Sequence, residues 1–162
     1  MQVEVGSALN PDEYPGLAHF WEHMLFMGTE KYPEEEIYSK YISDYGGYNN
    51  AYTGLEQTNY HFEVSNEGFE KSLDMFAQFF IAPLMAKDSV DREMNAIESE
   101  NNKNLQSDMW RFFQILQNES APTCTLNRFN TGNLLTLKKD GVVDALKDFH
   151  KKWYSANIMN LC

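Results

Sequence analysis

Strands are predicted in three parts of the chain, mainly from the alternation of hydrophobic and polar positions. The first lies at residues 2–7, where polar residues alternate with valines before a glycine. A pair of strands is predicted on either side of Gly54, because the apolar residues of 58–64 occupy every second position and so share one face. A further strand is expected over residues 157–162.

Apolar residues at helical spacing predict five helices, which cover residues 15–27, 33–45, 66–82, 88–118 and 142–154. The segment 88–118 contains no proline or glycine and is therefore expected to form one long helix. The aromatic and methionine residues on the helical faces are expected to belong to the hydrophobic core. They include Trp21, Met24, Phe26, Trp110, Phe112 and Phe113.

The order of these elements indicates the fold class. A strand, helices, further strands and again helices predict an α+β fold, in which a mixed or antiparallel sheet packs against helices. No repeat, low-complexity tract or linker divides the chain, so residues 1–162 are expected to form a single domain. A chain of this length buries on the order of two thirds of the surface that its unfolded form exposes, which is enough for a core without disulfide staples.

The composition excludes several classes of partner. The chain has 13 lysine and arginine residues against 24 aspartate and glutamate residues, a formal net charge of −11. Nucleic acid is not an expected partner, because binding to phosphates needs clustered positive charge. No apolar run approaches the roughly 18 residues of a membrane span and no leader is visible, so we expect no membrane partner and a cytoplasmic location.

The sequence His19-Phe-Trp-Glu22-His23 carries the clearest chemical signal. On a helix, two histidines four positions apart lie one above the other, so both imidazoles can reach one Zn²⁺. Glu22 shares that face and is placed to take a proton from a metal-bound water without being a ligand. The order H-x-x-E-H is a signature of zinc peptidases. The alternative is that both histidines are ordinary residues of an amphipathic helix with Glu22 as a solvated neighbour.

A zinc peptidase site also needs a third protein ligand. Glu93, Ile97 and Glu100 follow the spacing i, i+4, i+7 and so lie along one stripe of the predicted long helix. Either glutamate could bind the metal, and the other would then orient a histidine from outside the ligand set. Spacing alone leaves this choice open, and Asp91 and Glu98 are competing candidates.

Longer stretches of the chain resemble a known family. They are residues 16–29, which contain the histidine motif, and the runs Lys31-Tyr-Pro33, Asn50-Ala-Tyr-Thr53, Thr58-Asn-Tyr60, Asp91-Arg-Glu93, Ser99-Glu100, Phe129-Asn-Thr-Gly-Asn133 and Ser155-Ala-Asn157. Together they resemble the inverted zinc peptidases of clan M16, in the branch of insulin-degrading enzyme and pitrilysin. The resemblance runs nearly from end to end, so it is far more specific than the motif alone.

The resemblance implies a role for each residue of the candidate metal site. In that family the third ligand is a glutamate separated from the second histidine by 76 residues, and positions 24 through 99 make 76, which points to Glu100. The resemblance therefore implies that His19, His23 and Glu100 hold one Zn²⁺, that Glu22 is the general base, and that Glu93 lies just outside the ligand set.

The same resemblance implies a zinc-dependent endopeptidase that hydrolyses peptides or small proteins. Asn50 and Ala51 match the edge-strand segment that pairs with the backbone of the substrate in that family. Strand addition of this kind suits a peptidase with varied substrates, because main-chain hydrogen bonds supply affinity that does not depend on side chains.

Complete members of this branch are much longer and enclose the substrate between two halves. The chain is therefore expected to be one M16 N-terminal domain that is incomplete at both ends. Two functions stay open, namely a zinc endopeptidase and a catalytically incomplete fragment or paralogue that binds zinc and peptide or pairs with a full-length partner. An open sheet edge would favour self-association or a partner that supplies the missing half.

Overall fold

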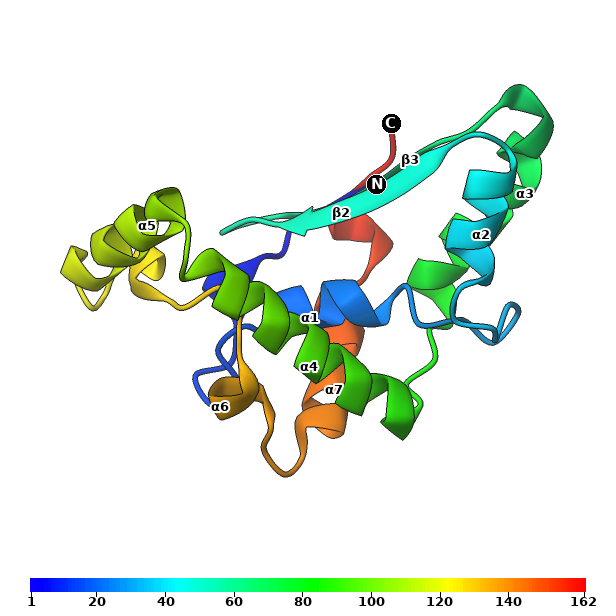
Figure 1. Cartoon of the computed structure of the whole chain (residues 1–162). Coiled ribbons are helices and arrows are strands. Elements are labelled where there is room, and N and C mark those ends of the chain that lie inside the picture. The colour runs from blue at the N-terminus through cyan, green and yellow to red at the C-terminus, as the bar shows by residue number, and fades with distance from the viewer.

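The computed structural model describes all 162 residues and shows one sheet with helices α1, α4 and α7 on the same side of it (Figure 1). The strands are β1 (Gln2–Val3), β2 (Tyr48–Thr53), β3 (Thr58–Glu63) and β4 (Met159–Asn160). The α-helices are α1 (Leu17–Met24), α2 (Ile37–Asp44), α3 (Asn66–Ile81), α4 (Lys87–Asn104), α5 (Asp108–Glu119), α6 (Leu134–Leu137) and α7 (Val142–Trp153). Three short 3-10 helices, η1 (Ser7–Leu9), η2 (Thr125–Asn127) and η3 (Ala156–Ile158), lie between them.

The sheet has the order β2-β3-β1-β4, and every neighbouring pair is antiparallel. β2 and β3 form a hairpin in which Tyr48 pairs with Glu63 and Thr53 pairs with Thr58. β2 is an edge strand, so the backbone groups on its outer side have no strand partner. The α+β prediction is confirmed, and of the two sheet types expected from the sequence the antiparallel one is present.

Helix α1 lies at the centre of the hydrophobic core. It contacts β2, α4 and α7, so it has packing partners on several sides. Six of its eight residues are buried, among them Leu17, Phe20 and Trp21, which are fully inaccessible to solvent. A helix that is apolar nearly all round is stable only in such a surrounding. His19, Glu22 and His23 are therefore carried by one of the most firmly held elements of the fold.

The prediction of one long helix over residues 88–118 is wrong, because the chain leaves the helix between α4 and α5. The last turn tightens, with the N–H groups of Gln106 and Ser107 bonded three residues back, and Ser107 is extended (φ −95°, ψ 123°). Asn104 and Ser107 are poor helix formers, and Ser107 followed by Asp108 is a typical helix start. The Ser107–Asp108 pair was the signal for the break between the two helices.

Several other predicted boundaries are shifted. The first strand, expected over 2–7, is restricted to β1, and the helix expected over 15–27 is restricted to α1. The helix expected from residue 33 begins at Ile37, because Glu35 is instead bound to Ser89 and Arg92 of α4. The strand expected over 157–162 is restricted to β4, which follows the 3-10 turn η3. None of these shifts changes the order of the elements.

The expectation that the aromatic residues of both helical faces are core residues is half wrong. Trp21 and Met24 of α1 are buried, and Phe26 packs against the core. On α5, however, Phe112 is 65% exposed and Trp110 is 41% exposed. The reason is that α5 extends away from the sheet, as Figure 1 shows, and contacts mainly η2, so much of its apolar face stays exposed.

Candidate metal centre and active site

The entry into α1 fixes where its side chains point. Gly16, just before the helix, has a left-handed conformation (φ 94°) and lies against Gly132, so closely that a Cβ on Gly16 would be 2.3 Å from the Gly132 Cα. Asn10 Oδ1 accepts a hydrogen bond from the N–H of Ala18 at 2.8 Å and so satisfies a free donor of the first turn. A hydrogen bond to the preceding loop and a close contact with the remote Gly132 thus hold the start of the helix.

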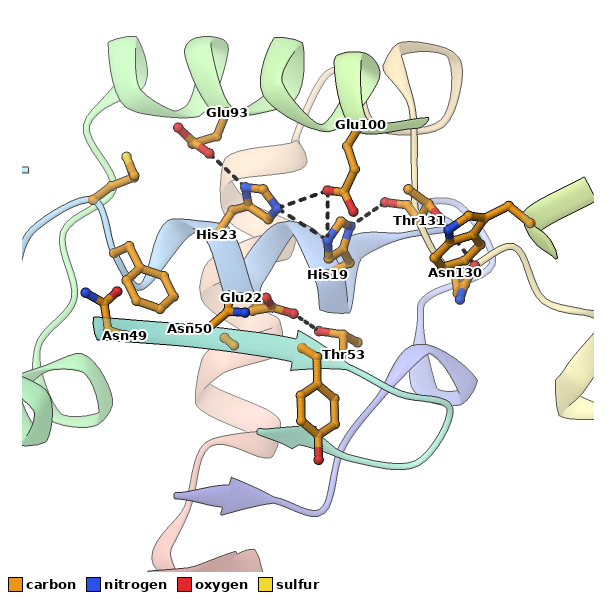
Figure 2. Close-up of a pocket in the computed structure, with 15 residues that line it drawn as sticks. His19, Glu22, His23, Asn49, Asn50, Thr53, Glu93, Glu100, Asn130 and Thr131 are labelled. Carbon is orange, nitrogen blue, oxygen red and sulfur yellow. Dashed lines mark hydrogen bonds and ion pairs between the residues drawn. The ribbon is translucent and has the colours of Figure 1, made fainter. Parts of the chain in front are cut away.

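His19 and His23 of α1 and Glu100 of α4 converge on one point (Figure 2). The two Nε2 atoms are 3.3 Å apart, and Glu100 Oε2 lies 3.5 Å from His19 Nε2 and 3.7 Å from His23 Nε2. Two donors that each lie about 2.0–2.1 Å from a tetrahedral zinc ion are roughly 3.3 Å apart. The three donor atoms are therefore spaced as the ligands of a single ion would be.

The other nitrogen of each histidine is already occupied. His19 Nδ1 lies 2.7 Å from the carbonyl oxygen of Thr131, and His23 Nδ1 lies 2.9 Å from Glu93 Oε2. A carbonyl or carboxylate oxygen only accepts, so both Nδ1 atoms carry the proton, and in the neutral rings both Nε2 lone pairs face Glu100. This tautomer is the one that metal-binding histidines adopt when an outer group bonds their second nitrogen.

In the metal-free chain, a proton on His23 stabilises the two converging imidazoles and the Glu100 carboxylate. Burial is the largest influence on His23 and lowers its pKa, but the bonds to Glu100 and Glu93 and the charge of Glu22 outweigh it and raise the pKa to about 9. The bond from His23 in turn lowers the pKa of Glu100, against the opposing effect of burial. A positive charge shared by these residues is thus favoured whether it is a proton or a metal ion.

Glu22 lies beside the three converging residues but is not one of them. Its carboxylate is buried between α1 and β2 and is 7% exposed. Burial raises its pKa, while the charges of His19 and His23 and a hydrogen bond from Thr53 act in the opposite direction. A carboxyl group with a raised pKa close to a cation site is suited to accept and release a proton near neutral pH.

A cavity of about 530 Å³ opens in front of these side chains. It is lined by the residues of α1 and α4 named above and by the edge strand β2, including Asn50 and Ala51. The exposure of β2 alternates, with Asn49, Ala51 and Thr53 half-buried and the residues between them exposed. The free edge of the sheet therefore borders the same cavity as the candidate metal ligands.

The structure thus brings together the residues that the family resemblance implies for the site, and it separates the two glutamates that spacing could not distinguish. The competing candidates Asp91 and Glu98 do not line the cavity, and Glu98 Oε2 instead accepts a hydrogen bond from the N–H of Leu134. Glu100 lies at the converging nitrogens, whereas Glu93 is bound to the far nitrogen of His23. Sequence reasoning missed Thr53 and Thr131. The period of β2 offered a signal for Thr53, but Thr131 acts through its main-chain carbonyl, which no residue type reveals.

The fold and this arrangement define a candidate metallopeptidase domain, and comparison with known proteins gives its family. The family model described as Insulinase (Peptidase family M16) matches residues 1–123. The A-factor-processing enzyme of Saccharomyces cerevisiae is 48% identical over 168 residues, which cover 100% of this chain and 16% of that protein. Insulin-degrading enzyme of Mus musculus is 45% identical over 168 residues, again 100% of this chain and 16% of the relative.

Solved structures agree with the sequence comparison. The crystal structure of pitrilysin matches with a TM-score of 0.92 and 39% identity, over 97% of this chain and 17% of the pitrilysin chain. The first half of the periplasmic protease PqqL from Escherichia coli matches with a TM-score of 0.82 and 27% identity, over 98% of this chain and 35% of that chain.

The chain belongs to the M16 insulinase family, in the branch of insulin-degrading enzyme and pitrilysin. It spans only about one sixth of the length of the curated relatives it matches. None of its helices is both long enough and apolar enough to cross a membrane.

Proposed function

We propose that the chain carries the zinc site of an endopeptidase that hydrolyses peptides or small proteins, and that it forms one M16 N-terminal domain. The observation that carries this proposal is the convergence of the two Nε2 atoms and Glu100 Oε2, with each Nδ1 bonded to an outer acceptor. Three donors of mixed nitrogen and oxygen type with a fourth side open to a cavity are typical of catalytic zinc sites.

The residues fit a zinc ion by their chemistry as well as by their spacing. His19, His23 and Glu100 would hold the ion, and Glu93 and the Thr131 carbonyl would keep the imidazoles in the ligating tautomer. Two converging lone pairs and a carboxylate repel one another when no cation is bound. A divalent ion removes that repulsion, which supports the proposed ligand set.

When bound, zinc lowers the pKa of a coordinated water to about 7 and polarises a peptide carbonyl. Glu22 takes the proton of the attacking water and passes it to the leaving amine. Its raised pKa favours this exchange, because a carboxylate with a higher pKa is a stronger base and accepts the proton more readily. Glu22 is 7% exposed, so the cavity is the side from which water and substrate reach its carboxylate.

The substrate backbone would bind along the edge strand β2. The outer side of β2 is unpaired and the strand borders the cavity, so an extended peptide can continue the sheet there. In this arrangement Asn50 and Ala51 pair with the peptide next to the bond that is cleaved. Affinity from main-chain hydrogen bonds allows substrates of unrelated sequence.

A second function is favoured by one specific observation, the small share of the relatives that the chain covers. Taken by itself, a domain of this size that binds zinc and peptide can be catalytically incomplete. It would then act by pairing with a full-length relative or with another copy of itself through an open sheet edge.

The test is hydrolysis of a quenched fluorescent peptide by the purified, zinc-loaded chain, with and without a chelator, beside Glu22→Gln and His23→Ala. The proposal expects Glu22→Gln to keep one zinc and lose turnover, by about 10²-fold or more, and His23→Ala to lose the zinc itself. Exposed Glu119→Gln on α5 is the matched control for both properties.

Retained turnover in pure Glu22→Gln protein would overturn the assignment of the base. Turnover that survives chelation would exclude a metal mechanism. A native chain that binds one zinc but hydrolyses no peptide would favour the second function.

A further inference from the structure

The Glu22 carboxylate has a single side-chain anchor. Thr53 Oγ1 donates a hydrogen bond to Glu22 Oε2, and no other hydrogen bond or ion pair reaches this carboxylate (Figure 2). Oε1 is left without a partner beside the cavity. A glutamate that is fixed only at its backbone has several rotamers open to it, so one anchored oxygen decides where the other one lies.

Thr53 is well suited to act as a fixed anchor. It is the last residue of β2 and pairs with Thr58 across the hairpin, and the N–H of Gly54 closes the following turn on the carbonyl of Gln57 at 2.7 Å. Its β-branched side chain is stiff at χ1. The hydroxyl is therefore held by the sheet, while the carboxylate that it binds is held by α1.

The bond is compatible with both protonation states of Glu22. Thr53 donates to Oε2 whether the group is a carboxylate or a carboxylic acid protonated on Oε1. The free oxygen is then the one that exchanges the proton, and the anchor persists while the charge changes. A preorganised base of this kind avoids reorganisation during the reaction.

We propose that Thr53 is a positioning residue that holds Glu22 in the orientation needed for proton transfer. This inference rests on the proposed function, since it assigns a partner to the base of that reaction. The inference also states which group of Thr53 is required. The hydroxyl is needed for positioning Glu22, and the methyl group is dispensable.

The experiment compares Thr53→Val, which keeps the shape without the hydroxyl, with Thr53→Ser, which keeps the hydroxyl. Thr53→Val should lower kcat about tenfold to a hundredfold with KM and zinc content unchanged, and Thr53→Ser should stay within about threefold of the native chain. Thr123→Val, at an exposed threonine outside the site, controls for the substitution itself.

A second measurement does not require turnover. Calorimetry gives the affinity of the zinc-loaded chain for a short peptide hydroxamate, a ligand that binds zinc through its oxygens and hydrogen-bonds to a neighbouring carboxylate. Thr53→Val should weaken this binding about tenfold. Without the Thr53 hydroxyl, the Glu22 carboxylate is no longer held where it can hydrogen-bond to the hydroxamate, and a hydrogen bond to a charged group contributes about this much. Thr53→Ser should leave it unchanged.

The outcomes separate the two proposals. If Glu22→Gln abolishes turnover or weakens hydroxamate binding while Thr53→Val changes neither, the positioning role is wrong and the proposed function stands. If Thr53→Ser is as impaired as Thr53→Val, or if Thr53→Val loses zinc, Thr53 has a structural role and the inference is overturned. If Glu22→Gln behaves as the native chain in both measurements, the proposed function itself fails.

Discussion

Helices α1 and α5 have similarly aromatic sequences but opposite surroundings. α1 contacts β2, α4 and α7, and its Trp21 is fully buried. α5 exposes Phe112 and Trp110 and buries only Gln117. α5 is held to the rest of the chain largely by polar bonds, such as the one from the Gln117 side chain to the Arg128 carbonyl at 2.8 Å. The hydrophobicity of a helix face therefore does not reveal whether that face has a packing partner.

The two helices also differ in whether they carry reactive side chains, although their aromatic content is similar. α1 carries two histidines and a glutamate into a buried position, because its apolar residues pack on several sides and the polar ones meet specific partners. α5 has an exposed apolar face and no titratable group in the metal cluster. Four predictions test this contrast and the site that α1 carries, beginning with the largest effect.

The largest expected difference is in stability. Trp21→Ala removes a fully buried ring from the core and should lower the free energy of unfolding by about 3–5 kcal/mol. Phe112→Ala on α5 should change it by less than about 0.5 kcal/mol, because this side chain is already 65% exposed. Urea unfolding of both variants measures the contrast, with Trp21→Phe in reserve if the alanine variant does not fold. Equal costs would show that α5 is buried in solution.

The next effect concerns the outer shell of the candidate metal site. Glu93→Ala leaves His23 Nδ1 without its partner and should weaken zinc binding about 10- to 100-fold. Glu119→Ala removes an exposed glutamate from α5 and should leave the affinity unchanged. Competition with a chromogenic chelator gives both values. A Glu93 variant with native affinity would mean that Glu93 does not orient the ligand.

The smallest expected effect is a proton released on zinc uptake. The pKa of His23 in the metal-free chain is raised from 6.5 to about 9, so the ring is protonated at pH 7.5, and a ligating histidine must be neutral. Binding should therefore release about one proton per zinc at pH 7.5 and progressively less as the pH rises through about 9. Calorimetry in two buffers of different ionisation enthalpy measures this number, and release of no proton at pH 7.5 would contradict it.

The same raised pKa has a consequence for the metal-free fold. Because the folded pKa lies above the unfolded value of 6.5, the contribution of His23 to stability is fully present below about pH 6.5 and is lost as the pH rises through about 9. Bound zinc should abolish this dependence, since it replaces the proton. Thermal unfolding with and without chelator across this range checks the sign.

Local patterns predicted much of the fold because their causes are local. The alternation on either side of Gly54 and the helical spacing of the apolar residues gave the strands and most helices correctly. The break at Ser107 was missed because no proline or glycine marks it, and a serine followed by aspartate is a weaker signal. The exposure of α5 was missed because burial depends on what lies opposite a face, which no local pattern contains.

For the site, the sequence alone determined which side chains lie on the same face of a helix. A spacing of four residues places His19 above His23 whatever the rest of the chain does, and Glu93 and Glu100 share a stripe of α4 for the same reason. Helix spacing left open which glutamate reaches the converging nitrogens; the family resemblance pointed to Glu100, and the tertiary structure brings Glu100 there. That Thr131 holds the first histidine and that Thr53 reaches Glu22 were decided only by tertiary structure. These contacts join residues 31 to 112 positions apart, so their geometry follows from how the helices and the sheet pack, and not from the regular backbone of any one element.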